Sequence, residues 1–316
     1  MLSNAGLEIL DVLCSEREAT AKDLAAETGH SRKQIYRVLD TLLELGLVEE
    51  SRRQHNQRVV RTTETPVVEA YRQLTAKLNH VDWSELLSPA TIRVCWYLDE
   101  PRRVMTIATR LGITRQAVHN SLSPLKNRAM LSPYGPEYAL VDDLDPLLAF
   151  SREVVIHEHR IRVRNLAPSA TIEWCDPNRA LVQVQTPEDT DTLQRAPEWD
   201  LTGLARFHEY GLQFFLAGEP AFWYAPDDLL TPADVVCHTL VLEAGSRRVS
   251  YAMLLIEQER ITEDELIEAA QWYGIESLIE PLYQFIEGEF DSTGDVGVVI
   301  PSAREYAALK EQYGVA

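Results

Sequence analysis

Side chains that donate hydrogen bonds gather within one short stretch of the chain. Arg32, Lys33, Tyr36 and Arg37 stand within six residues. On a helix, spacings of three and four residues bring side chains to one face, so this set would project together. Arg and Lys contact phosphate oxygens and the acceptor edges of guanine, and the phenol adds a further donor. The spacing therefore predicts a surface that contacts a nucleic acid.

A helix that begins at Ser31 must position these donors. Ser is a preferred N-cap residue and Gly46 is a typical helix stop, so a helix is expected over 31–45. Apolar residues recur along it at spacings of three and four, so they should face a core. They are Ile35, Leu39, Leu42 and Leu43. Two shorter helices are expected before it, over 4–15 and 20–28. Three helices in this order are typical of a helix-turn-helix, whose last helix enters the major groove.

A polar hairpin is expected directly after this helix. Besides the four donors above, we expect further residues at the start of the helix and in the hairpin to contact DNA. They are Ser31, Arg52, Arg53, Gln57 and Arg58. A basic hairpin tip can contact phosphate groups or enter the minor groove, where Arg is favoured. Residues 4–63 resemble the winged helix-turn-helix of MarR- and TrmB-type transcriptional regulators. The resemblance implies binding to double-stranded DNA.

The same pattern returns 83 positions later, where Gly112 and Thr114 stand in the places of Gly29 and Ser31. The corresponding donors, also predicted to contact DNA, are Arg115, Gln116, His119 and Asn120. Gln and Asn can pair with adenine. However, Pro124 is expected to bend this helix or end it early, and the hairpin after it is almost uncharged. DNA contact and a structural or partner-binding role stay open for this second copy.

The repeat divides the chain into predicted parts. The expected fold class is α+β, with two tandem winged helix-turn-helix domains followed by a small α+β domain with a C-terminal helical bundle. The predicted boundaries are 1–65 for the first winged domain, 66–87 for a connecting helix, 88–141 for the second winged domain, 142–168 for a linker helix and 169–316 for an acidic effector or interaction domain. The connecting helix could pair two copies of the chain or pack against its own.

The net charge of -19 is unevenly distributed. Residues 1–150 hold 18 Lys and Arg against 20 Asp and Glu, whereas residues 151–316 hold 12 against 29. Lys is scarce, and such a composition resembles that of cytosolic proteins of salt-adapted archaea, which implies that the acidity serves solubility. The four cysteines lie far apart in apolar stretches, which favours free thiols over disulfides or a metal site. We expect no metal, no cofactor, no membrane span and a cytoplasmic location.

A second resemblance concerns the helices after residue 231. The stretch from Asp234 onward is similar to the helical tail of nucleotidyltransferase-like proteins of toxin–antitoxin systems. The residues at its matching positions are His238, Arg247, Arg248 and Tyr251. Nucleotide transfer would need paired carboxylates that hold Mg²⁺, and the sequence offers only Asp189 and Asp191, in a segment that reads as a loop without Gly-Ser upstream. Catalysis is therefore not expected.

These patterns together predict a sequence-specific DNA-binding transcriptional regulator. It would act as a repressor, would not be an enzyme, and would read DNA mainly through the first winged domain. One alternative is an antitoxin-like autoregulatory protein that binds a partner through its C-terminal domain. Another is a nucleotidyltransferase-like enzyme. The expected partners are double-stranded DNA, a second copy of the chain, and a protein or small-molecule effector at the C-terminal domain.

Overall fold

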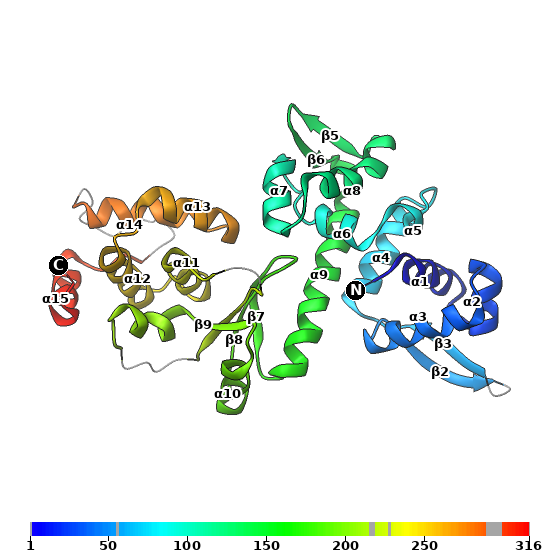
Figure 1. Ribbon diagram of the computed structural model, residues 1–316, viewed down its shortest axis with the longest axis horizontal. Helices are drawn as coiled ribbons and strands as arrows, with labels where there is room; N and C mark the ends of the chain where they lie inside the picture. Colours follow the sequence, from blue (N-terminus) through cyan, green and yellow to red (C-terminus); the bar gives the residue numbers. More distant parts are fainter. Residues whose placement is uncertain (1, 55–56, 215–218, 227–228, 289–298, 316) are drawn as a thin grey trace. The chain divides into compact units, whose positions relative to one another are not determined.

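The computed structural model describes residues 2–54, 57–214, 219–226, 229–288 and 299–315, with the side chains of 52–54, 57 and 133–134 left out (Figure 1). The chain combines helices with small sheets and is of the predicted α+β class. It divides into an N-terminal unit, Met1–Ile161, and a C-terminal unit, Arg162–Ala316. Within the described ranges, no helix is both long and apolar enough to cross a lipid bilayer.

The N-terminal unit begins with three helices and three strands. They are α1 (Asn4–Glu16), β1 (Glu18–Thr20), α2 (Ala21–Thr28), α3 (Arg32–Glu44), β2 (Val48–Gln54) and β3 (Gln57–Thr62). Thr20 and Asp23 form a capping box at the start of α2, and Gly29 ends it with a φ of 72°, which favours glycine. The strands form an antiparallel sheet in the order β1-β3-β2. The apolar face of α3 is buried, as its spacing predicts.

The connecting segment packs against its own unit. It contains α4 (Pro66–Lys77) and α5 (Trp83–Leu86). The buried side chains of α4 are Val67, Val68, Ala70, Tyr71 and Leu74. The ring of Tyr71 lies 5.3 Å from that of Phe150, centroid to centroid. Because its own chain covers this apolar face, α4 does not offer it to a second copy.

A second set of elements follows in the same unit. It comprises α6 (Pro89–Cys95), β4 (Arg102–Arg103), α7 (Val104–Leu111), α8 (Arg115–Asn127), β5 (Leu131–Tyr134) and β6 (Glu137–Leu140), with an antiparallel sheet in the order β4-β6-β5. Pro124 lies inside α8, yet the helix continues to Asn127. The prediction of an early end at Pro124 is therefore wrong. Val118, Leu122 and Leu125 are buried and hold this helix in place.

A long helix, α9 (Asp145–Leu166), follows the short 3-10 helix Asp142–Leu144. Its N-terminal part is fixed to both earlier sets of elements. Ser151 Oγ donates to the carbonyl of Ile92 at 2.5 Å, and His157 Nε2 lies 2.7 Å from the carbonyl oxygen of Leu45. These two contacts bind distant segments of the N-terminal unit into one body.

The C-terminal unit contains one antiparallel sheet. Its elements are β7 (Thr171–Cys175), β8 (Ala180–Gln183), α10 (Pro187–Arg195), β9 (Trp199–Thr202), the 3-10 helix η2 (Gly203–Tyr210) and β10 (Ala221–Tyr224), with strand order β7-β8-β10-β9. The predicted loop around Asp189 is wrong, because Thr186 caps a helix there. Pro187 occupies the first turn of that helix, where its missing N–H is tolerated.

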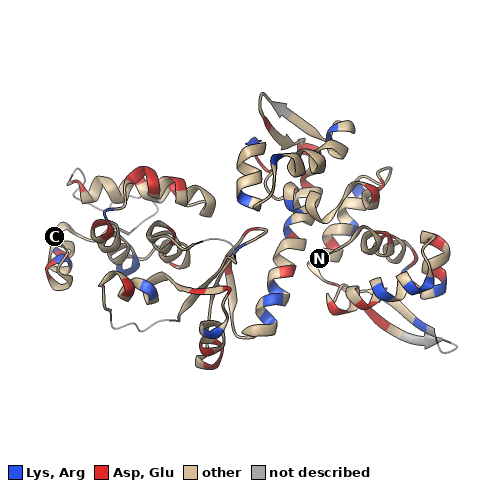
Figure 2. Ribbon diagram, viewed as in Figure 1, with Lys and Arg blue, Asp and Glu red and all other residues tan. Residues whose placement is uncertain are grey.

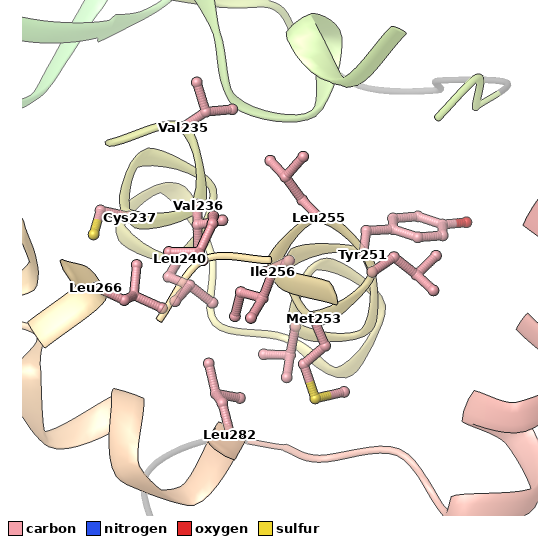
Figure 3. Close-up of a cluster of buried hydrophobic side chains, with 14 of the residues drawn as sticks. Val235, Val236, Cys237, Leu240, Tyr251, Met253, Leu255, Ile256, Leu266 and Leu282 are labelled. Carbon is pink, nitrogen blue, oxygen red and sulfur yellow. The ribbon is translucent and has the colours of Figure 1, made fainter. Parts of the chain in front are cut away.

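Helices complete this unit and form most of its core. They are α11 (Pro232–Leu242), α12 (Ser246–Glu259), α13 (Glu263–Tyr273), the short η3 (Glu276–Leu278), α14 (Ile279–Ile286) and α15 (Ala303–Tyr313), close to the predicted helices. Figure 3 shows Val236, Leu240, Leu266 and Leu282 among the buried side chains that pack between them. The acidic residues of this unit lie along such helices as α13 (Figure 2).

Candidate functional site

The four donors of α3 lie on the surface. Arg32, Lys33, Tyr36 and Arg37 are all exposed, and Tyr36 is 42 % exposed, which is unusual for a large aromatic side chain. Ser31 has a different task, because its hydroxyl accepts the backbone N–H of Gln34 and caps the helix. Sequence spacing thus predicts correctly which residues share this face.

The described basic residues of the hairpin are engaged in ion pairs. Arg58 lies 3.1 Å from Asp40 and 2.9 Å from Glu50, and Arg61 lies 2.7 Å from Glu49. A phosphate group would have to compete with these carboxylates for the same guanidinium groups. The side chains of Arg52, Arg53 and Gln57 lie outside the described part of the structure. The two described arginines of the hairpin, Arg58 and Arg61, are therefore paired with carboxylates of the same unit.

The donors of the second copy are also exposed. Arg115, Gln116, His119 and Asn120 lie on the outer side of α8. Gln116 Nε2 donates to Asn120 Oδ1 at 2.9 Å, so these two amides satisfy one another along the helix. The structure does not bring this set together with the α3 donors in any described contact.

A small hollow lies where the start of the chain meets α3. It has a volume of about 180 Å³. Its lining is Leu2, Ser3, Gly6, Arg37, Val38, Thr41, Leu42 and Leu45. Five of these eight residues are apolar or lack a side chain, and Arg37 stands at its polar edge. The hollow is an open depression of mixed polarity beside an exposed helix face.

The C-terminal unit holds a larger cavity, of about 450 Å³. Its lining is Thr202, Leu204, Ala205, Glu219, Pro220, Ala221, Thr239, Leu242, Glu243, Arg247 and Arg248. Gly203 lies between the lining residues Thr202 and Leu204; its φ of 61° suits glycine, and a Cβ there would lie 3.3 Å from Leu242 Cδ1. The size is that of pockets that take small organic molecules. Sequence reasoning named Arg247 and Arg248 but missed the cavity.

A buried chain of hydrogen bonds begins at the cavity residue Thr202. Its Oγ1 lies 2.7 Å from His238 Nδ1, and His238 Nε2 lies 2.9 Å from the hydroxyl of Tyr273. That hydroxyl donates to Asp234 Oδ1 at 3.0 Å. Since the one phenolic proton goes to the carboxylate, the Tyr273 hydroxyl accepts from Nε2–H of His238. We call these four residues the His238 array.

The array is held by the packing around it. His238 and Thr202 are completely buried, and the imidazole lies 4.3 Å from the ring of Trp223. Asp234 is fixed independently, because its other oxygen accepts from the backbone and hydroxyl of Thr231 in a capping box. The two ends of the array are thus tied to β9 and α11. No sequence spacing signals it, since its members lie up to 71 positions apart.

The two acidic residues considered for metal binding serve the helix instead. Asp189 Oδ2 accepts the backbone N–H of Ser169 at 2.7 Å, and hydrogen bonds with the side chain and then the backbone of Ser169 lower the pKa of Asp189. Asp191 lies 3.6 Å from Arg195 one turn later. In the described residues, no group of three His, Cys, Asp or Glu is placed to hold a metal ion.

Two parts of the chain match known families. Residues 1–67 match the O-methyltransferase dimerisation domain. Residues 196–315 match a family described as HVO_2833_C, C-terminal. No curated protein matches the chain.

The first match corrects the sequence-based interpretation. The resemblance to MarR- and TrmB-type regulators is wrong, and the prediction of a DNA-binding repressor falls with it. So do the antitoxin-like and nucleotidyltransferase-like alternatives and the expectation that the chain is not an enzyme. The physical reason is that caps, glycines and apolar spacings determine how this region folds. They do not determine what its exposed residues bind.

Proposed function

We propose that this protein is a homodimer assembled through residues 1–67. The observation that carries the proposal is the match of this region to a dimerisation domain of O-methyltransferases. The ion pairs of Arg58 and Arg61 support it, because a self-neutralised surface suits contact with another protein better than contact with a polyanion.

The proposed contact surface centres on the hollow between α1 and α3. Leu2, Val38 and Leu45 give it apolar lining, and Arg37 edges it. Exposed Tyr36 and Arg37 are of the residue types that interfaces favour. Because stable interfaces bury about 1,200–2,000 Å² in total, the hollow would be the centre of a wider patch around the exposed face of α3.

Sedimentation velocity over a range of protein concentrations tests this assembly. Thr41→Arg places a long charged side chain at the rim of the hollow, where Thr41 is exposed, so the fold is retained. We expect the wild type to sediment as a dimer and Thr41→Arg to weaken the dimer by about tenfold or more. A wild type that stays monomeric at all concentrations would refute the proposal.

Thr192→Arg is the matched control. Thr192 is an exposed helical Thr whose hydroxyl donates to the carbonyl four residues earlier, as Thr41 does, but it lies on α10 in the C-terminal unit. This variant should stay dimeric. If Thr41→Arg were equally dimeric, the hollow would be excluded as the contact surface.

The finer domain division belongs to the same proposal. We place a first winged helix at 1–65, a connecting helix at 66–87, a second winged helix at 88–141, a linker helix at 142–168 and the acidic domain at 169–316. The order of two helices and two paired strands in both α2–β3 and α7–β6 supports two winged modules. Limited proteolysis followed by mass spectrometry would reveal these boundaries as preferred cleavage sites.

Methyl transfer to an oxygen is a second candidate function. The same family match favours it, since the domain is described as part of O-methyltransferases. The match ends at residue 67, so an acceptor would have to bind elsewhere, and the cavity of the C-terminal unit has a suitable volume. Transfer of labelled methyl from S-adenosylmethionine to small hydroxylated acceptors, lost when Ala205→Trp fills the cavity, would establish it. If the wild-type protein is dimeric but transfers no label, methyl transfer is contradicted and the proposal of assembly stands alone.

A further inference from the structure

The cavity of the C-terminal unit has two chemically different sides. Leu204, Ala205, Pro220, Ala221 and Leu242 line it with hydrocarbon. The guanidinium groups of Arg247 and Arg248 line another part. A ligand that matches both sides must carry an apolar body and a negative charge.

The two arginines are oriented by their neighbours. Arg247 Nε donates to the hydroxyl of Tyr251 at 3.4 Å, and its guanidinium carbon lies 5.6 Å from the centre of that ring. Arg248 Nε lies 3.0 Å from Glu243 Oε2. Each contact uses Nε, and a guanidinium carries further N–H donors on its terminal nitrogens. These contacts thus orient both arginines through Nε, and both residues line the cavity.

Two carboxylates also line the cavity and affect which charge it can bind. Glu219 and Glu243 both line it, and both are exposed. Glu243 is paired with Arg248, so its charge is locally compensated. An entering anion would therefore meet Arg247 first, and would share Arg248 with Glu243 in the manner of a branched ion pair.

The start of α12 adds to the positive potential here. Arg247 and Arg248 lie in the first turn of this helix, which has no acidic residue there and no side-chain cap on its N-terminus. Cations at this end of a helix are unfavourable, because the helix dipole is positive there. Four other helices of the chain, α2, α11, α13 and α15, carry a complete capping box with a carboxylate at this point. Binding of an anion in the cavity would relieve the repulsion at α12.

The wall formed by Thr202 is rigid. The His238 array fixes its hydroxyl from behind, and the residue is completely buried against the sheet. A preformed wall lowers the conformational entropy that a ligand must remove on binding.

We infer that this cavity binds a small organic anion, an apolar molecule that carries one carboxylate, sulfonate or phosphate group. Arg247 and Arg248 hold the charged group, and the hydrocarbon side of the cavity holds the body. The inference concerns the C-terminal unit alone and does not rest on dimerisation through residues 1–67.

A fluorescence titration with anilinonaphthalene sulfonate tests the site, because this probe combines an aromatic body with one anionic group. The full chain should bind it saturably, with one site per chain. Arg247→Gln combined with Arg248→Gln should weaken binding by about tenfold or more, as expected when charge-assisted hydrogen bonds are removed. Benzoate should displace the probe, whereas inorganic phosphate, which lacks an apolar body, should displace it poorly.

Two further variants separate the cavity from non-specific adsorption of the probe. Arg195→Gln removes an exposed guanidinium from α10, outside the cavity lining, and should leave binding unchanged. Ala205→Trp leaves the charges intact but fills the cavity, and should abolish binding. Circular dichroism of each variant confirms that it is folded. Equal affinity in the wild type and in the double Arg variant, or in Ala205→Trp, would overturn the inference.

Discussion

In the N-terminal unit the described charged side chains pair mainly across the surface, whereas in the C-terminal unit a chain of hydrogen bonds runs through the interior. Arg58 with Asp40 and Glu50 represents the first arrangement, with side chains about 34 to 59 % exposed. The His238 array represents the second, with His238 fully buried. Water screens the first arrangement more strongly than the second, in which His238 and Thr202 are completely buried. The same kinds of atoms should therefore contribute very different amounts to stability in the two units.

The apolar cores provide the reference for this comparison, because there the two units should behave alike. Leu39→Ala in α3 and Leu255→Ala in α12 both remove a fully or almost fully buried side chain. Each should lower the free energy of unfolding by about 2–5 kcal/mol, from lost burial and the cavity left behind. Chemical denaturation measures the loss, and hydrogen exchange shows which unit has lost protection. A loss below about 1 kcal/mol at either site would mean that its surroundings collapse into the space.

The His238 array should give the next largest effect. Tyr273→Phe keeps the ring but removes the hydroxyl that accepts from His238 and donates to Asp234. Because the bond to His238 is buried and the bond to Asp234 is partly buried, we expect a loss of about 1–3 kcal/mol in the free energy of unfolding. Tyr138→Phe, on a partly exposed tyrosine of β6, serves as the control and should change stability little. If Tyr273→Phe left the free energy of unfolding unchanged, the array would contribute no more to stability than a surface pair.

Acid should destabilise the C-terminal unit more than the N-terminal unit. Hydrogen bonds from Thr262 lower the pKa of Glu265, and those from Ser302 lower the pKa of Glu305. In the same unit, bonds from Ser169 lower the pKa of Asp189. In the N-terminal unit, bonds from Thr20 lower the pKa of Asp23, and a bond from the Ser84 side chain lowers that of Asp82. A carboxylate with a lowered pKa stabilises the fold above its ordinary value near 4, and this contribution disappears as pH falls through the folded-state pKa.

Glu265→Gln isolates this effect. Gln can complete a capping box as a neutral acceptor, so the fold is kept while the titrating group is removed. Unfolding followed between pH 7 and pH 3 should show a shallower loss of stability for this variant than for the wild type. Partly exposed Glu263, on the same helix, gives the control variant Glu263→Gln. Identical pH profiles for wild type and Glu265→Gln would show that this capping carboxylate does not cause the loss of stability in acid.

The sequence predicts the local structure of both units well and their chemistry unequally. Caps such as Ser31 and Thr262 and the apolar spacing of α3 act over a few residues, so the helices they start are readable from the chain. The His238 array joins residues of β9, α11 and α13, and only the tertiary fold brings them together. The loop expected at Asp189 became a helix because Thr186 and Pro187 start one.

The exposed face of α3 predicts function poorly. The spacing of Arg32, Lys33 and Tyr36 establishes a shared face, which the structure has. It does not show that Asp40 and Glu50 neutralise Arg58 beside that face. Ion pairs between separate elements leave no periodic pattern in the sequence. A basic stretch, taken without these pairs, therefore predicts a site for phosphate.

Arg58→Gln should give the smallest effect and completes the comparison. The guanidinium of Arg58 bridges α3 and the hairpin through Asp40 and Glu50, but its side chain is 40 % exposed. Exposed pairs typically contribute about 0–1 kcal/mol, so the free energy of unfolding should change by no more than that. Repeating the denaturation at high salt should shrink even this difference, because salt screens exposed charges, whereas the loss caused by Tyr273→Phe should persist. If Arg58→Gln proved as costly as Tyr273→Phe at both salt concentrations, burial would not be what separates the two units.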